Sequence, residues 1–81
     1  MGMNGEMETI TDTASLGLLI RRERKAQNLT QVQLAGLTGV GVRFLRELEG
    51  GKPSCQIGLI LKVAAALGIA VSAGVRRERT S

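Results

Sequence analysis

The chain has 81 residues, 43% of them hydrophobic but only one aromatic, and a net charge of +4. This length allows one small domain with an aliphatic core, and the lack of histidine together with a single cysteine excludes an internal disulfide, a serine–histidine–aspartate triad and the usual metal-ligand clusters. No apolar stretch can span a bilayer and the N-terminus is acidic, unlike a signal peptide, so we expect a cytoplasmic protein.

The first 14 residues show no periodicity, and we expect a disordered acidic tail there. They contain three acidic residues and no basic one, whereas residues 15–81 contain 11 basic and 4 acidic residues, a net charge of +7. A folded segment with this charge favours a polyanionic partner.

A first helix is predicted from a cap at Thr13 or Ser15 to about Asn28. Its apolar face includes an arginine, Arg24, at helical spacing from aliphatic residues. A guanidinium on that face needs a partner, because an uncompensated buried charge is costly. Glu49, at the inner end of a later helix, is the best candidate, so we predict an ion pair between Arg24 and Glu49.

Two short helices, about Gln31–Thr38 and Gly41–Glu49, are predicted next, joined by a tight turn. Thr30 can cap the first of them. Gly39 stands where that helix ends and the backbone turns left-handed, which glycine does at little cost. This is the layout of a helix-turn-helix, in which the second helix is presented to the major groove of DNA.

A fourth helix is predicted from Ser54 or Cys55 to Gly68, with two apolar stripes. The stripe expected to close the four-helix core contains Ile57, Ile60, Leu61, Ala64 and Leu67. The stripe expected to face a partner contains Leu59, Val63 and Ala66. A domain this small cannot cover both stripes by itself.

Residues 69–75 alternate with a period of two, which predicts a strand, and residues 76–81 form a basic flexible tail. A lone strand leaves its backbone groups unpaired, so we predict a homodimer in which the strand pairs antiparallel with its copy across a twofold axis. A frayed tail is the alternative for the last residues. The predicted dimer contacts are Leu59, Val63, Ala66, Ile69, Val71, Ala73 and Val75.

The predicted elements resemble the XRE family of lambda-repressor-like DNA-binding domains. The matching residues are Leu16-Gly17, Ile20-Arg21, Arg24-Lys25, Thr30-Gln31, Leu34-Ala35, Gly39-Val40, Leu45, Leu48-Glu49, Gly50-Gly51-Lys52 and Ala66-Leu67-Gly68. Within the family the chain is similar to the HipB antitoxin subgroup over roughly residues 15–75. The resemblance implies an all-α, lambda-repressor-like bundle of four helices with its DNA-binding domain at residues 15–68. It also implies the Arg24–Glu49 pair and an intermolecular ribbon of strands.

In a helix-turn-helix of this register, the exposed early positions of the third helix face base edges. The predicted base-contacting residues are Gly41, Val42, Arg43, Arg46 and Glu47. Arg43 is the best candidate for direct readout, because a guanidinium can donate two hydrogen bonds to guanine. Glu47 could accept from cytosine or orient Arg43, and Arg46 could reach a phosphate instead. Phosphate contacts are predicted for Gln31 and Lys52.

The sequence therefore predicts a repressor that binds an inverted repeat in double-stranded DNA as a homodimer. The HipB likeness further implies an antitoxin that restrains a HipA-like kinase toxin and represses their shared operon. A stand-alone repressor is the alternative, and a DNA-independent adaptor is a third possibility. Residues 50–52, Gly-Gly-Lys, resemble a phosphate loop only superficially, because Pro53 replaces the serine or threonine. We expect no enzyme, cofactor or metal site.

Overall fold

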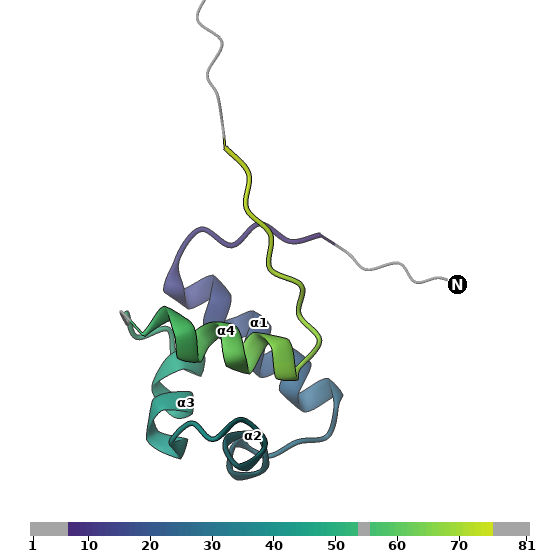
Figure 1. Ribbon diagram of the computed structural model, residues 1–81, viewed down its shortest axis with the longest axis vertical. Helices are drawn as coiled ribbons and strands as arrows, with labels where there is room; N and C mark the ends of the chain where they lie inside the picture. Colours follow the sequence, from purple (N-terminus) through teal and green to yellow (C-terminus); the bar gives the residue numbers. More distant parts are fainter. Residues whose placement is uncertain (1–6, 54–55, 76–81) are drawn as a thin grey trace, which may run out of the picture.

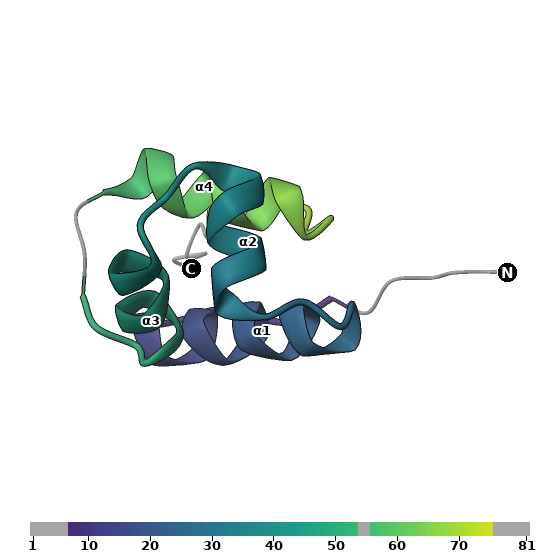
Figure 2. The same ribbon diagram turned by 90° about the horizontal axis from the view of Figure 1, so that it is seen from below.

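The computed structural model describes residues 7–53 and 56–75, and this part of the chain forms four α-helices. They are α1 (Thr13–Ala26), α2 (Gln31–Thr38), α3 (Val42–Glu49) and α4 (Ile57–Ala66) (Figure 1). In Figure 2, α1 and α4 lie on opposite sides of the molecule, α2 runs between them, and α3 lies beside α2. The all-α class and the four predicted helices are confirmed. No helix in the described ranges is long and apolar enough to cross a membrane.

Three predicted features lie partly or wholly outside the described residues. These are the first part of the acidic tail (residues 1–6), the expected start of the fourth helix at Ser54 or Cys55, and the basic tail (residues 76–81).

α1 begins two residues earlier than the predicted folded domain, and its cap is Asp12 rather than Thr13 or Ser15. The Ser15 backbone N–H donates to a carboxylate oxygen of Asp12 over 2.8 Å, and the Asp12 N–H donates to the Ser15 hydroxyl over 3.3 Å. This reciprocal pair satisfies donors that the first helical turn leaves free. The hydrogen bond from the Ser15 N–H lowers the pKa of Asp12 below its ordinary value of 3.8.

α1 ends at Ala26, and two residues later Asn28, with a positive φ of 59°, turns the chain away from the helix axis. The following N–H, of Leu29, donates to the carbonyl of Arg24 over 3.1 Å. Leu29 then packs against the core.

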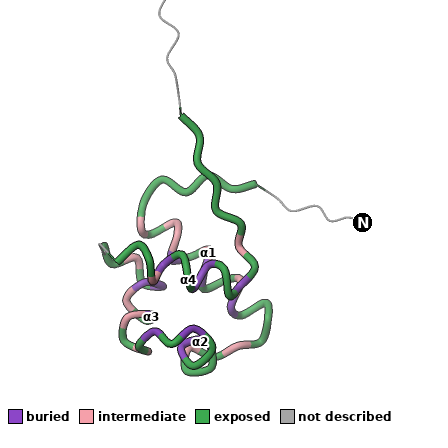
Figure 3. The backbone as a smooth tube through the Cα atoms, viewed as in Figure 1, coloured by how far each residue is buried: buried purple, intermediate pink, exposed green. Residues whose placement is uncertain are grey.

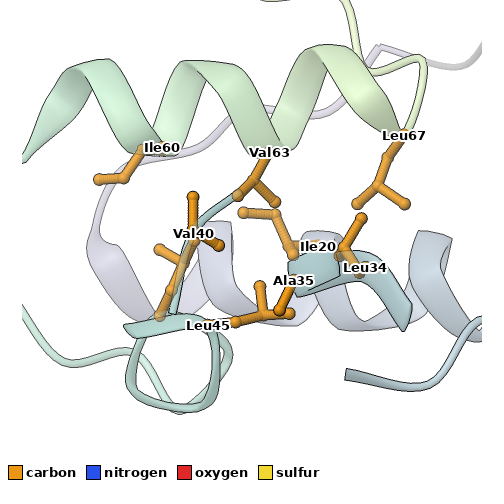
Figure 4. Packing of buried hydrophobic residues seen from close by; sticks show 9 residues of the cluster. Ile20, Leu34, Ala35, Val40, Leu45, Ile60, Val63 and Leu67 are labelled. Carbon is orange, nitrogen blue, oxygen red and sulfur yellow. The ribbon is translucent and has the colours of Figure 1, made fainter. Parts of the chain in front are cut away.

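One aliphatic core joins the four helices (Figure 4). Its fully buried side chains are Ile20 of α1, Leu34 of α2, Leu45 of α3 and Val63 of α4. The packed residues come from every helix, so no helix can leave without exposing apolar area, each Å² of which is worth about 25 cal/mol. α2 and α3 are therefore held by the whole bundle rather than by their own short length.

α4 turns a different face to this core than the sequence predicted. Ile60, Ala64 and Leu67 are buried as expected, but Ile57 and Leu61 are 61% and 44% exposed. Val63, assigned to a dimer contact, is instead fully buried in the core of its own chain. All ten residues of α4 except Lys62 are apolar or glycine, so periodicity alone does not select the inner face.

Residues 69–75 extend away from the helices and form no strand in the described single chain (Figures 1 and 3). Only Ile69 returns to the bundle, where it packs against the core and its N–H donates to the carbonyl of Ala64 over 2.9 Å. Val71 and Val75 are 62% and 78% exposed. The predicted strand is thus not formed, because the chain offers it no other strand to pair with.

Candidate nucleic-acid interface

The turn between α2 and α3 fixes the direction in which α3 leaves α2. Thr30 and Gln33 cap α2 reciprocally, with the Gln33 N–H donating to the Thr30 hydroxyl over 3.0 Å. Gly39 ends α2 with φ 79°, and its N–H donates to the carbonyl of Ala35 over 2.8 Å. Val40 follows and is only 7% exposed, which anchors the turn in the core. The predicted cap and glycine turn are confirmed.

α3 has one face in the core and one in solvent. Leu45 and Leu48 are buried, while Arg43 and Arg46 are exposed. Gly41, the N-cap of α3, is exposed and has open space around it. Val42 is half-buried against the core. The five residues predicted to meet base edges therefore lie at the start and on the outer side of α3.

A carboxylate links two cations on this outer side. Arg43 donates from Nε to Glu47 over 3.4 Å, and Lys52 donates from Nζ to the same carboxylate oxygen over 3.2 Å. These bonds, that from Lys52 foremost, lower the pKa of Glu47. The Arg43 side chain is still 88% exposed, so this pairing orients the guanidinium and leaves it accessible to a ligand.

A second, buried network lies behind the helix-turn-helix. Arg24 donates from Nε and Nη2 to the two carboxylate oxygens of Glu49, over 2.6 and 2.9 Å. Arg24 also donates to the carbonyl of Leu29, and the Gln31 amide donates to Glu49 over 3.1 Å. Both charges are almost entirely buried, and the hydrogen bond from Arg24 to Glu49 raises the pKa of Arg24. The predicted ion pair is present, and it joins α1, the start of α2 and the end of α3.

Two close backbone contacts hold α3 and the turn after it against α1, and sequence reasoning missed both. A β-carbon on Gly17 would stand 2.4 Å from the carbonyl oxygen of Leu48. A β-carbon on Gly51 would stand 2.9 Å from the α-carbon of Ala14. The Thr13 hydroxyl adds a hydrogen bond to the Gly51 carbonyl over 2.6 Å. Gly17 is one of the residues that match the XRE family. The periodicity of the sequence, however, did not indicate that the absence of a side chain there lets α3 approach α1 closely.

The two residues predicted to contact phosphate, Gln31 and Lys52, differ in exposure and in hydrogen-bond partner. Gln31, the first residue of α2, is half-buried, and one hydrogen of its amide is engaged by Glu49. Lys52 lies just after α3 and is held beside it by Glu47.

The predicted dimer residues lie on α4 and on the segment after it, away from the cations of α3. Of them, Ala66, Val71, Ala73 and Val75 are exposed, while Leu59 and Ile69 pack partly against the core.

Comparisons with known proteins agree with this geometry. The model of the helix-turn-helix family matches residues 20–73, well over half of the chain. The uncharacterized HTH-type transcriptional regulator y4mF of Sinorhizobium fredii (strain NBRC 101917 / NGR234) is 47% identical over 70 residues, covering 86% of this chain and 92% of that protein. The crystal structure of the restriction-modification controller protein C.AhdI from Aeromonas hydrophila superposes with a TM-score of 0.65 at 33% identity, covering 72% of this chain and 88% of that one.

Proposed function

This chain belongs to the helix-turn-helix family of DNA-binding transcriptional regulators, which are not enzymes, and we propose that it is a repressor that reads one DNA sequence with α3. The observation that carries the proposal is the presentation of Arg43. Its guanidinium is nearly fully exposed on a helix whose opposite face is locked into the core.

In this proposal Arg43 donates two hydrogen bonds to O6 and N7 of a guanine, as the fork geometry of a guanidinium allows. Glu47 restricts the positions that Arg43 can take, because the two side chains are already joined. Val42, at the first turn of α3, packs on a thymine methyl group. Gly41 lets the backbone approach the bases, since no side chain stands there.

Lys52 and the start of α2 flank α3 and are the proposed phosphate contacts. Lys52 is 62% exposed in its side chain, so it reaches a phosphate by exchanging Glu47 for the new anion. Gln31 contributes its second amide hydrogen, while Glu49 holds the first. These contacts position the protein without reading sequence.

We infer that two copies bind one operator. Support comes from the apolar surface that one chain leaves uncovered on and after α4: Ile57, Leu61, Val71 and Val75 are all exposed. A second copy would cover part of this surface, and residues 69–75 would find in it the strand that a single chain lacks. Two α3 helices related by a twofold axis would meet half-sites roughly 34 Å apart.

The finer role, a HipB-like antitoxin, stays a prediction from resemblance, with the stand-alone repressor as its alternative. The likeness to a restriction-modification controller protein favours a regulatory role in either case. Pull-down with the product of the neighbouring gene separates the two roles. A bound kinase supports the antitoxin, and an operon without one supports the repressor.

Selection of bound duplexes from a random DNA pool, followed by gel shift on the gene's own promoter, tests the proposed function. We expect an inverted repeat that also occurs in the promoter, bound at least a thousandfold more tightly than scrambled DNA. A pool that shows no enriched sequence would contradict sequence-specific repression.

A further inference from the structure

A groove opens where α1, the start of α2 and the end of α3 meet. Its lining residues are Arg21, Arg24, Gln31, Arg46, Glu49 and Gly50. It continues into a neighbouring groove that shares Arg24, Gln31 and Arg46 and adds Lys25, Leu29 and Val42 among others. The two grooves together run past the end of α1, the start of α2 and the exposed side of α3 that carries Arg46.

The floor and the rim of this groove differ in charge. On the floor, Glu49 neutralises Arg24 within the buried pair. On the rim, Arg21 and Arg46 are exposed, and neither forms an ion pair within residues 7–53 and 56–75. The rim therefore carries two uncompensated guanidinium groups, one from α1 and one from α3.

Arg46 lies on the side of α3 that faces this groove, whereas Glu47 faces Lys52 on the other side. Arg43 lies between them on the helix surface. Because Arg46 shares its groove with Arg21 and not with Arg43, its position favours an anion over a base edge.

We propose that this groove seats one backbone phosphate of the bound DNA, held between Arg21 and Arg46. The proposal rests on the proposed function and assigns Arg46 to phosphate rather than to base readout. A guanidinium donates paired hydrogen bonds to phosphate oxygens, and two of them, one from α1 and one from α3, match one phosphodiester anion. The Arg24–Glu49 pair beneath keeps the floor neutral and holds the three helices at a fixed separation. The seat fixes the register of α3 on the duplex.

The test compares the full-length chain with Arg21→Ala, Arg46→Ala and the double variant on the selected operator, over a series of salt concentrations. Each phosphate neutralised contributes roughly 0.9 to the slope of log K against log salt. If both arginines are needed to hold one phosphate, each single variant loses that contact and lowers the slope by roughly that amount per half-site, and the double variant lowers it no further. Arg22→Ala is the matched control, since Arg22 neighbours Arg21 on α1, pairs with Glu8 and does not line the groove.

Replacing single phosphates by uncharged methylphosphonates locates the seat on the DNA. We expect one position per half-site where the replacement weakens the wild type and leaves Arg21→Ala unchanged. Unchanged slopes in both single variants, or loss of preference at one base position in Arg46→Ala, would overturn the proposal. So would Arg21-dependent binding of inorganic phosphate with no sensitive methylphosphonate position, because the site would then take a free anion. Lack of any operator for the wild type is a separate failure, that of the proposed function.

Discussion

Gly17 of α1 lies so close to Leu48 of α3 that a β-carbon on Gly17 would stand 2.4 Å from the Leu48 carbonyl oxygen. The carbonyl oxygen of Glu49 would be 2.8 Å away. Both are backbone atoms of α3, which cannot rotate aside as a side chain can. The direction of the proposed reading helix is thus set by backbone contact with α1.

Gly17→Ala should lower the free energy of unfolding by about 1–3 kcal/mol, because α3 must shift to admit the methyl group. Urea unfolding followed by circular dichroism measures the change. Gly36→Ala is the control: it lies within α2, and apart from its own stretch of helix no atom lies within 4 Å of its β-carbon position. There alanine should stabilise by about 0.5–1 kcal/mol through helix propensity. Equal effects in the two variants would refute the close packing at Gly17.

Breaking the buried pair should be the most damaging polar change in the chain. Arg24→Met or Glu49→Leu alone leaves one buried charge without a partner and should cost about 3–5 kcal/mol of stability. The double variant should lose less than the sum, since no unpaired charge remains. Arg22→Met, on the same helix as Arg24, breaks an exposed pair with Glu8, which precedes α1, and should cost at most about 1 kcal/mol. Thermal unfolding of the four variants measures these losses of stability. A double variant whose loss equals the sum of the Arg24→Met and Glu49→Leu losses would contradict a coupled pair.

The cap of α1 predicts a specific acid sensitivity. Because the folded-state pKa of Asp12 is lowered, its contribution to stability is present above the ordinary value of 3.8 and is lost as the pH falls through the lower, folded value. Asp12→Asn keeps a good N-cap side chain but does not titrate. As the pH falls from 5 to 2, the melting temperature of the wild type should therefore decrease more than that of Asp12→Asn. Parallel curves would show that Asp12 does not cap α1 in solution.

The C-terminal segment should control the oligomeric state. Deleting residues 70–81 retains Ile69, which packs against the core, and removes most of the proposed pairing segment. We expect sedimentation velocity to show a dimer for the full chain and a monomer for the shortened one. Val71→Asp with Val75→Asp should have the same effect without shortening the chain, because both side chains are exposed. A dimer that survives both changes would rule out this segment as the interface.

The helix-turn-helix and the buried pair could be predicted from sequence because each depends on local signals. Thr30 and Gly39 mark the ends of α2, and an arginine at a core-facing position demands an acid. The face of α4 could not be predicted, since Ile57 and Val63 are both aliphatic and only the packing of α4 on the other helices buries Val63. The Asp12 cap was missed because three neighbouring residues could each have served.

Within the site, the sequence pattern placed the five candidate base-contacting residues at the start and on the outer side of α3 but did not identify their partners. That Arg43 and Lys52 converge on Glu47 depends on the path of the chain after α3. Arg21 and Arg46 line the same groove because α1 contacts α3. That contact is made at a glycine, Gly17, so no pattern of apolar residues in the sequence indicates it.

The most direct test of the central claim is the affinity of Arg43→Ala for the selected operator and for scrambled DNA, with Arg22→Ala as control. Loss of about 1–3 kcal/mol on the operator, with little change on scrambled DNA and with an unchanged melting temperature, is the predicted result. An equal loss on both DNAs would contradict base readout by α3.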